Sequence, residues 1–469
     1  MVNFGTSGFR GIMGDKFTKE NVQKFAYALK ILNKEKLNFK KVSIGFDNRF
    51  MSPNFAKWFL EAFYYDDVEI IFFSQSVPSP LISFESKNSI GVMITASHNP
   101  YEYNGIKFFI NQREIDNDIA KDIERLANIE DKKDFETVPF YEIEKRNNFH
   151  YTTNIENYCN NILKLIDMKK INSDLKVCYN NMFGSALNCV KYLLNKLGIK
   201  KVETLNETVD PYFSYRLPCP YPANLKEQVE FIVKNNFDIG FAVDGDGDRF
   251  CAIDKNGKLF DCNYIMAILY YYLLKYKHYK GSIILDVATT SLIKKVAEHF
   301  GFNAIYSVHG FKNIGENILK NNAFMGGESN GIAFREHLLS KDGVVLIPLI
   351  LEILTETKLS LTQFVEELEK ELNFKSTIIE KNFTLTKEEI AKLNNKIFIE
   401  KYIPNISEKI VNTSYFDGLK ILFENDYWLC IRFSGNEPVI RLFIEEDSPN
   451  KANLILNEVI KDLNLCNLQ

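Results

Sequence analysis

Apolar and polar positions alternate along the first hundred residues with two different periods. Between residues 20 and 36 the apolar side chains recur three and four positions apart, as on one face of a helix. Residues 52–65 predict a second helix, with Pro53 in its first turn. Continuous apolar runs that end in polar turns predict buried strands at residues 41–47, 68–73 and 89–95. Strands that alternate with helices indicate a mostly parallel sheet with helices on its faces.

The same alternation recurs further along the chain. It predicts strands at residues 175–179, 237–243, 281–287 and 303–308, and helices at residues 186–197 and 291–300. We therefore expect an α/β protein of three successive α/β domains with mixed, mostly parallel sheets, followed by a C-terminal α+β domain. The expected domains span residues 1–150, 151–255, 256–375 and 376–469.

The last hundred residues have a different pattern. The charged stretches 128–148 and 366–388 are interpreted as connections. Beyond them the pattern predicts an antiparallel sheet with helices packed on it. The expected elements are a helix at 388–400, strands at 420–425, 428–434 and 439–446, and a closing helix at 451–463.

Composition narrows the class of protein. The chain has 469 residues, of which 46% are hydrophobic and 25% charged, which is ordinary for a soluble globular enzyme. A formal net charge of -4 argues against broad nucleic-acid binding. The apolar run at 264–274 is shorter than the roughly 20 residues of a membrane span, and the N-terminus does not resemble a signal peptide. The eight cysteines form no C-x-x-C pair, which argues against a zinc ribbon. We expect a cytoplasmic protein with reduced thiols.

A serine lies directly after the apolar run that ends near residue 94. Residues 95–100 read TASHNP, and residues 104–107 read NGIK. Ligand chemistry in α/β sheets gathers at such carboxyl ends of strands. Ser97 is a candidate nucleophile or phosphate carrier that His98 can position, and Lys107 is expected nearby. The alternative is a loop in which Ser97 only caps a helix.

Three carboxylates alternate with two glycines at residues 244–249 (DGDGDR), again after a buried strand. The glycines allow the backbone to curl, so that Asp244, Asp246 and Asp248 can face one cation. Hard oxygen ligands suit Mg²⁺ or Ca²⁺. An EF-hand would require Gly and Glu where Arg249 and Lys255 stand, so that class of site is excluded. Arg249 indicates an anion beside the metal.

Two further loops carry groups that suit a sugar phosphate. Residues 326–331 (GGESNG) offer Glu328 and Asn330 to sugar hydroxyls. Residues 432–438 (RFSGNEP) and the following Arg441 combine arginines with a glycine turn, which is typical of an anion site. Without context, both loops could also be ordinary surface turns.

Together these motifs resemble the α-D-phosphohexomutase family, which includes phosphoglucomutase and phosphomannomutase. Five motifs match in the family's order: GTSGFRG at 5–11, the serine loop, the carboxylate loop, the 326–331 loop and the 432–438 loop. Two positions depart from the family: Asn330 replaces a serine and Asn436 a threonine. The HGFK at 309–312 resembles the phosphoglucomutase branch.

The resemblance implies a role for each matched position. Ser97 would carry the phosphoryl group and its phosphate would complete a metal site with Asp244, Asp246 and Asp248. The catalytic group would be Ser97, Lys107, Arg10, His98 and Lys312. Substrate would contact Arg249, Glu328, Asn330, Arg432, Ser434, Gly435, Asn436 and Arg441.

The implied reaction converts a hexose 1-phosphate into the 6-phosphate through a 1,6-bisphosphate. Mg²⁺ is the implied cofactor and glucose 1,6-bisphosphate the activator, with glucose phosphate as the expected substrate and no nucleic-acid or membrane partner. Mannose, glucosamine or pentose phosphate, or a sugar-phosphate-binding protein without catalysis, remain alternatives. The chain would act as a monomer or homodimer.

Overall fold

The computed structural model describes residues 5, 8–129, 136–433 and 438–465. The chain divides into two compact units. Unit 1 comprises residues 1–262 and 330–362, and unit 2 comprises residues 263–329 and 363–469. Within the described ranges, no helix is both long and apolar enough to cross a membrane.

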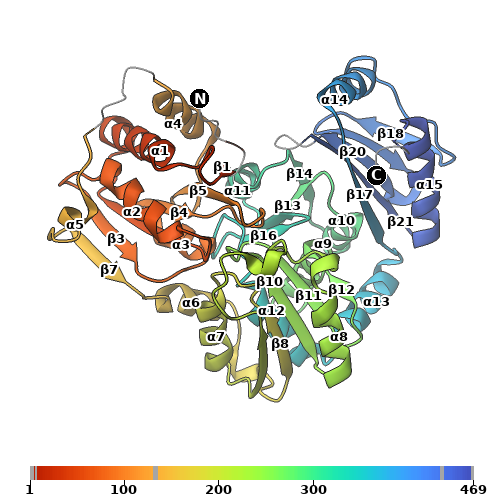
Figure 1. The fold of residues 1–469 in the computed structure, drawn as a ribbon. Coiled ribbons are helices and arrows are strands. Elements are labelled where there is room, and N and C mark those ends of the chain that lie inside the picture. Colours follow the sequence, from red (N-terminus) through yellow and green to blue (C-terminus); the bar gives the residue numbers. More distant parts are fainter. Residues whose placement is uncertain (1–4, 6–7, 130–135, 434–437, 466–469) are drawn as a thin grey trace. The chain divides into compact units, whose positions relative to one another are not determined.

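The first sheet of unit 1 has the strand order β1-β5-β4-β2-β3-β7, and the short β6 pairs with the end of β5 (red to yellow in Figure 1). Strands β4, β2, β3 and β7 are parallel, whereas β5 runs antiparallel between β4 and β1. The antiparallel β5 was not predicted, and it carries Lys107 back beside the strand that leads to Ser97. The bounds are β1 Phe9–Ile12, β2 Lys41–Phe46, β3 Glu69–Phe73, β4 Ile90–Ile94, β5 Tyr103–Ile110, β6 Arg113–Glu114 and β7 Phe149–Thr152.

Helices cover both faces of this sheet. Successive strand residues point to opposite sides, so each face presents side chains that a helix can bury. Ile44 and Val92 belong to the core that also contains the buried faces of α1, α2 and α4. Gly45 and Gly91 point the other way, where a side chain would collide with Ile82 of α3. The bounds are α1 Lys19–Leu32, α2 Ser52–Phe63, α3 Ser79–Glu85, α4 Asn117–Ala127 and α5 Phe140–Ile143.

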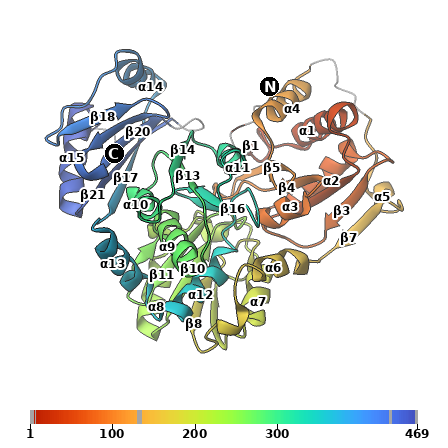
Figure 2. The ribbon, with the colours of Figure 1, turned by 180° about the vertical axis from the view of Figure 1, so that it is seen from behind.

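The second sheet of unit 1 has the order β12-β11-β10-β8-β9. Its centre is parallel (β9, β8, β10) and continues into the antiparallel β11 and β12. Helix α12, from the later segment of unit 1, packs against α7, as Figure 2 shows from behind. The bounds are α6 Glu156–Leu163, β8 Lys176–Asn180, α7 Leu187–Lys196, β9 Lys201–Leu205, α8 Lys226–Asn235, β10 Ile239–Val243, β11 Phe250–Asp254, β12 Leu259–Phe260, β16 Gly331–Phe334 and α12 Leu346–Thr357.

Unit 2 contains the parallel strands β14, β13 and β15 in that order, with β13 in the middle. Helix α9, which contains the apolar run at 264–274, is buried along most of its length. The bounds are α9 Cys262–Lys275, β13 Ile283–Asp286, α10 Ser291–His299, β14 Ala304–Ser307, α11 Phe311–Lys320, β15 Met325–Glu328 and α13 Leu361–Leu372.

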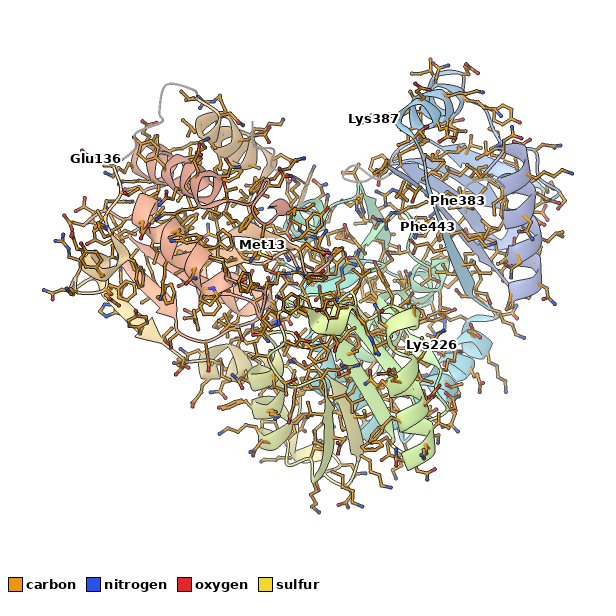
Figure 3. The ribbon with its side chains drawn as sticks, in the orientation of Figure 1. Met13, Glu136, Lys226, Phe383, Lys387 and Phe443 are labelled. Atoms are coloured by element: carbon orange, nitrogen blue, oxygen red, sulfur yellow. The ribbon has the colours of Figure 1, made fainter. Side chains whose placement is uncertain are left out.

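The C-terminal sheet of unit 2 is antiparallel with the order β17-β21-β20-β19-β18. Helix α15 lies beside β21 and β17, and Phe383 and Phe443 mark these two strands in Figure 3. The prediction of a connection at 366–388 was wrong, because most of α13 and all of β17 occupy it. The exposed side chains of these elements alternate with buried or half-buried ones, so high charge there reflects a solvated face. The bounds are β17 Thr377–Thr384, α14 Lys387–Asn394, β18 Ile410–Ser414, β19 Leu419–Phe423, β20 Trp428–Phe433, β21 Val439–Glu446 and α15 Pro449–Asp462.

The predicted fold class is confirmed: mixed, largely parallel α/β sheets precede a C-terminal α+β part. The loops that matter for function follow the carboxyl ends of β4, β10, β13, β14, β15 and β20.

Candidate active site

The serine loop follows β4 and is buried. Ser97 is 1% exposed and has a φ of 53°, in the left-handed region. This conformation is unfavourable for a residue with a side chain, so the surroundings must hold it. Ser97 N donates to Thr95 Oγ1 at 2.8 Å, and Thr95 Oγ1 donates to Asp47 Oδ2 at 2.6 Å.

Arg49, which the sequence analysis did not select, grips this loop. Its Nη1 donates to the carbonyls of Pro100 (2.7 Å) and Tyr103 (2.9 Å). Its Nη2 donates to the carbonyls of Ser97 (2.7 Å) and Asn99 (2.6 Å). The planar guanidinium thus uses all four terminal N–H groups on one loop, which no other side chain can do.

The charge of Arg49 is balanced by Asp47, whose Oδ2 lies 3.2 Å from Arg49 Nε. Both side chains are fully buried. Although burial raises the pKa of Asp47, Arg49 and the hydrogen bond from Thr95 oppose that rise. Thr95, held by Asp47, therefore fixes the N–H of Ser97, and Arg49 fixes its C=O. The sequence does contain a pattern that points to these two residues: Asp47, at the end of the predicted strand 41–47, and Arg49 form a D-x-R.

The carboxylate loop follows β10, and its three aspartates are buried. A carboxylate oxygen from each of Asp244, Asp246 and Asp248 lies within 4.8 Å of the others. Gly245 allows the loop to meet the serine loop, since a Cβ there would lie 2.7 Å from the carbonyl oxygen of Ser97. The two loops that the sequence singled out are therefore in contact within unit 1.

A chain of hydrogen bonds fixes the hydroxyl of Ser97. Arg249 Nη2, which can only donate, lies 3.2 Å from His98 Nε2. Burial, with the charges of Arg249 and Arg10, holds the pKa of His98 well below its usual range, so the ring is neutral. His98 Nδ1 then carries the proton and donates to Ser97 Oγ (3.1 Å), which donates to Asp244 Oδ2 (2.7 Å). His98 has no free lone pair, so in this arrangement it positions Ser97 and does not accept its proton.

Lys107 lies among the carboxylates. Its Nζ is 2.6 Å from Asp246 Oδ2 and 2.6 Å from Asp248 Oδ2, and the residue is 2% exposed. Burial lowers the pKa of Lys107, but Asp246 and Asp248 outweigh burial and raise the pKa above its ordinary value. In this geometry Lys107 is an ammonium that can donate a proton.

The carboxylate loop fits a divalent cation. The Oδ1 atoms of Asp246 and Asp248 are buried and accept no hydrogen bond from the described residues. Burial, Asp248 and Asp246 together raise the pKa of Asp244 well above its ordinary value, which shows that positive charge is short there. Buried carboxylate oxygens without donors are the ligands that Mg²⁺ prefers.

Replacing Lys107 with methionine is expected to lower the free energy of unfolding by about 3 kcal/mol or more, because it leaves buried carboxylates without a counter-charge. Added Mg²⁺ should raise the unfolding midpoint of this variant more than that of the parent protein. Thermal unfolding with and without Mg²⁺ measures both effects. The control is Lys36→Met, since Lys36 pairs with Asp122 on the surface and its loss should change little. An unchanged midpoint for Lys107→Met without Mg²⁺ would contradict the prediction.

Arg10 also reaches the serine loop. It lies on β1, opposite Gly105 of β5, and its Nη1 donates to Asn99 Oδ1 at 2.5 Å. Burial lowers its pKa, against the raising effect of Asp246. The structure thus gathers Ser97, His98, Arg10, Lys107, Arg249 and the three aspartates in unit 1.

A second polar group lies in unit 2. Asp286 ends β13, Glu328 ends β15, and His309 follows β14. His309 Nδ1 lies 2.7 Å from Asp286 Oδ2 and 3.5 Å from Glu328 Oε1. Although burial lowers the pKa of His309, Glu328 and Asp286 raise it above its ordinary value. The sequence analysis selected Glu328 but neither Asp286 nor His309 as a site residue.

Two predicted phosphate-binding arginines lie opposite each other in unit 2, Arg432 on β20 and Arg441 on β21. Arg432 pairs with Asp286 Oδ2 (3.5 Å) and Asp417 Oδ2 (3.4 Å), and Arg441 pairs with Glu380 (3.7 Å). Like charges on facing strand positions repel, and an anion would relieve that repulsion. The predicted Ser434, Gly435 and Asn436 lie outside the described residues.

The remaining predicted residues are more dispersed. Lys312 lies in the first turn of α11 in unit 2. Asn330 belongs to unit 1, where its Oδ1 accepts a hydrogen bond from Lys341 Nζ at 3.3 Å. His337 lies apart from these residues in unit 1, where it is buried and bonds to Asp342 at 2.6 Å.

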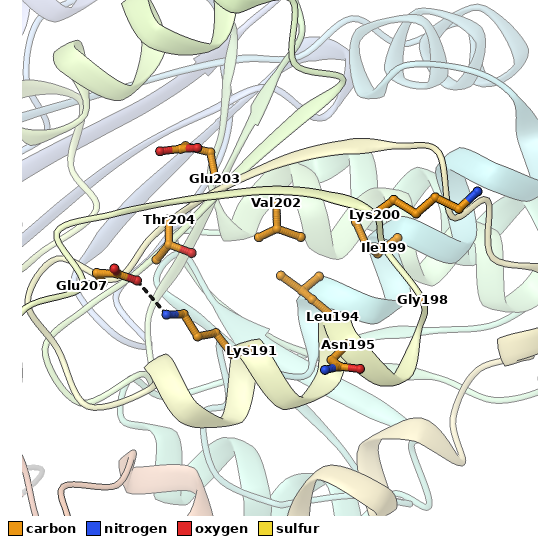
Figure 4. Close-up of a pocket in the computed structure, with 10 residues that line it drawn as sticks. All are labelled: Lys191, Leu194, Asn195, Gly198, Ile199, Lys200, Val202, Glu203, Thr204 and Glu207. Carbon is orange, nitrogen blue, oxygen red and sulfur yellow. Dashed lines mark hydrogen bonds and ion pairs between the residues drawn. The ribbon is translucent and has the colours of Figure 1, made fainter.

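A cavity of about 680 Å³ lies elsewhere in unit 1, between α7 and β9 (Figure 4). It is open, and an ion pair between Lys191 and Glu207 (2.7 Å) closes one end. None of the predicted site residues that the structure describes lines it. The cavity is therefore separate from the chemistry of the serine and carboxylate loops.

Comparison with known proteins accounts for this arrangement. Four successive profiles of phosphoglucomutase/phosphomannomutase match: domain I at residues 1–134, domain II at 156–257, domain III at 261–372 and the C-terminal domain at 380–462. A phosphoglucosamine mutase of Methanococcus vannielii is 30% identical over 98% of both chains. The chain belongs to the phosphoglucomutase/phosphomannomutase family.

Other relatives of this phosphohexomutase agree. A phosphoglucomutase/phosphomannomutase of Thermococcus kodakarensis is 29% identical over 98% of this chain and 97% of its own. The crystal structure of a Thermus thermophilus protein described as a phosphomannomutase has a TM-score of 0.84 and 26% identity to this chain, and the match covers 98% of both chains. The N-acetylphosphoglucosamine mutase of Aspergillus fumigatus, solved with GlcNAc-6P and magnesium, has a TM-score of 0.57 at 13% identity and shows the fold alone.

The family assignment fixes the class of reaction. The chain is an isomerase that moves a phosphoryl group within a sugar phosphate, in a family that depends on magnesium. The names of the relatives favour phosphoglucosamine and phosphomannose over the glucose phosphate that the sequence analysis expected.

Proposed function

We propose that this phosphohexomutase interconverts the 1- and 6-phosphates of a hexosamine, with phosphorylated Ser97 as the donor and a 1,6-bisphosphate as the intermediate. The role of Ser97 as phosphoryl carrier is supported by the hydrogen-bond chain that runs from Arg249 through His98 to Ser97 and Asp244. Arg49 binds four carbonyls of the serine loop and so keeps Ser97 in one orientation. Phosphoryl transfer to and from Ser97 requires such a fixed orientation.

Asp244, Asp246 and Asp248 would hold Mg²⁺, with Ser97 or its phosphate as a further ligand. The ion would supply positive charge that stabilises the transferring phosphoryl group. Lys107 would be the proton donor to the oxygen that leaves phosphorus, although its two carboxylate partners raise its pKa and so oppose release of the proton. Arg10 and Arg249 add guanidinium groups beside the same loop.

The polar group of unit 2 would take the sugar and its non-reacting phosphate. Arg432 and Arg441 offer a two-sided grip for the phosphate, together with Ser434, Gly435 and Asn436. Glu328 would accept hydrogen bonds from two ring hydroxyls, with Asn330 and Lys312 as the further contacts that the resemblance implies.

The charge of this group favours an amino sugar. Asp286, Glu328 and Asp417 carry three negative charges, whereas Arg432 and the neighbouring Lys420 carry two positive charges, so one negative charge is in surplus when His309 is neutral. The ammonium of a hexosamine would offset the surplus, and the neutral hydroxyl of glucose would not. Glucose phosphate is the second candidate, supported by the GFK at residues 310–312 that resembles the phosphoglucomutase branch.

The test compares glucosamine 6-phosphate, glucose 6-phosphate and mannose 6-phosphate at neutral pH, with Mg²⁺ and a trace of the matching 1,6-bisphosphate. We expect kcat/KM to be about tenfold or more higher for glucosamine 6-phosphate, which corresponds to about 1.4 kcal/mol from one added ionic contact. Glucose 6-phosphate is the matched control, because it differs only in the group on carbon 2.

The outcomes separate the two parts of the proposal. Equal kcat/KM for glucosamine and glucose phosphates would refute the preference for an amino sugar. No isomerisation of any of the three sugars, under conditions where the protein is folded, would refute the mutase function itself.

A further inference from the structure

Three side chains with metal-binding chemistry meet at the carboxyl ends of neighbouring strands in unit 2. Asp286, His309 and Glu328 follow or end β13, β14 and β15, which are parallel and adjacent. Each contributes one oxygen or nitrogen, and these three atoms lie within 4.8 Å of one another. The aspartates of the carboxylate loop belong to unit 1, so this is a different group of residues.

The two carboxylates are buried and already oriented by the backbone. Asp286 and Glu328 are each 2% exposed. Asp286 Oδ1 accepts from Ala288 N at 2.7 Å, which leaves Oδ2 turned toward His309. Glu328 Oε1 accepts from Gly310 N at 2.8 Å. Ligands held in this way by the main chain need little rearrangement when a metal binds.

The charge balance supplies an independent reason for a divalent cation. With His309 neutral, the three carboxylates of Asp286, Glu328 and Asp417 exceed the two nearby positive groups, Arg432 and the buried Lys420, by one. Arg432 does not block a cation, since Asp417 Oδ2 at 3.4 Å offers it a second partner once Asp286 Oδ2 turns to the metal. A cation would offset this negative surplus.

We propose that Asp286, His309 and Glu328 form a zinc site, with the fourth position of the ion open to water or ligand. Imidazole nitrogen and carboxylate oxygen are both ligands of zinc, and three protein ligands with one open position is the arrangement of zinc sites that are not purely structural. Mg²⁺ prefers an all-oxygen shell, so the imidazole selects zinc over the magnesium of the carboxylate loop.

Zinc at this position would withdraw Glu328 from the sugar. This consequence rests on the proposed function, in which Glu328 accepts hydrogen bonds from ring hydroxyls. Zinc would then act as an inhibitor that competes with the sugar phosphate, whereas zinc binding itself does not depend on any mutase activity.

The experiment is calorimetric titration of ZnCl₂ into the full chain at saturating Mg²⁺, with Asp244→Asn/Asp246→Asn as a second host in which the carboxylate loop is disabled. We expect one zinc ion to bind in both hosts. His309→Gln and Glu328→Gln should each weaken that binding by at least about tenfold, because each removes a ligand. Replacing Zn²⁺ with Co²⁺ should give a visible absorption band that His309→Gln abolishes.

The matched control is His299→Gln. His299 is exposed to a similar degree (40%, against 42% for His309) and also lies near a carboxylate, Glu371 at 3.2 Å. Zinc binding should be unchanged in this variant. If His309→Gln binds zinc as tightly as the parent protein, or if His299→Gln loses the same binding, the proposed site is overturned. Unfolding midpoints establish that each variant is folded at the titration temperature.

A last measurement concerns the inhibitory role. Glucosamine 6-phosphate should raise the apparent dissociation constant of zinc in the parent protein. An unchanged dissociation constant would refute the proposal that zinc competes with the sugar phosphate. The substrate comparison run without zinc decides the mutase function separately.

Discussion

Replacing Ser97 with alanine is expected to reduce mutase turnover by about 10⁴-fold or more, because the phosphoryl group loses the only oxygen that can carry it between the two halves of the reaction. The fold should be retained, with a loss of about 1–3 kcal/mol in the free energy of unfolding, because His98 and Asp244 lose a buried hydrogen-bond partner. Two measurements test this: turnover of glucosamine 6-phosphate with Mg²⁺, and transfer of labelled phosphate from a 1,6-bisphosphate to the protein. Both should disappear in Ser97→Ala.

The control for this experiment is Ser89→Ala. Ser89 is also a fully buried serine of unit 1, but its hydroxyl donates to the carbonyl of Glu85 and contacts none of the site residues. Its replacement should leave labelling and turnover near those of the parent protein. Turnover or labelling that survives in Ser97→Ala would rule out Ser97 as the carrier.

Replacing Arg49 with lysine is expected to lower kcat by about 100-fold and to reduce the free energy of unfolding by about 3 kcal/mol. A lysine keeps the charge beside Asp47 but cannot donate to four carbonyls in one plane, so several buried carbonyls lose their donors. Ser97 would then lose the constraint on its left-handed backbone, and small misplacements of a reacting group reduce rates by about that factor. Urea unfolding and steady-state kinetics measure the two effects.

A purely structural role for Arg49 would lower stability alone, so the kinetics must be measured where the variant is fully folded. Under those conditions we expect kcat to fall while KM stays close to its original value, because Arg49 touches the serine loop and not the sugar. Arg113→Lys is the matched control: Arg113 pairs with Asp116 on the surface, at 3.1 Å, and its replacement should be nearly neutral. A folded Arg49→Lys variant with full kcat would contradict the positioning role.

Much of the fold could be predicted from hydrophobic periodicity. The helices α1 and α2 and the strands β2, β3 and β4 lie within two to four residues of their expected bounds, because each has a clear apolar face. The prediction failed for β17, which lies in a charged stretch, because an edge strand with one solvated face carries charge without losing its pairing.

The candidate site residues could be predicted from the sequence where several of them lie together in one loop. Ser97 and the three aspartates were selected from sequence because they come directly after buried strands, where ligand chemistry gathers in α/β sheets. Arg49, Asp286 and His309 were missed for the opposite reason. Each is one polar residue at an ordinary strand end, and its importance depends on partners 15 or more positions away along the chain.

The sequence alone established an α/β enzyme with a serine loop and an acidic loop, and local patterns suffice for that because they follow from chain geometry and side-chain chemistry. Only the tertiary structure showed that the two loops touch, since Gly245 matters through its distance to Ser97. It alone also showed that burial and neighbouring arginines lower the pKa of His98, and that Asp246 and Asp248 raise the pKa of Lys107. Packing determines which residues distant in the chain come into contact, and a local sequence pattern does not predict those contacts.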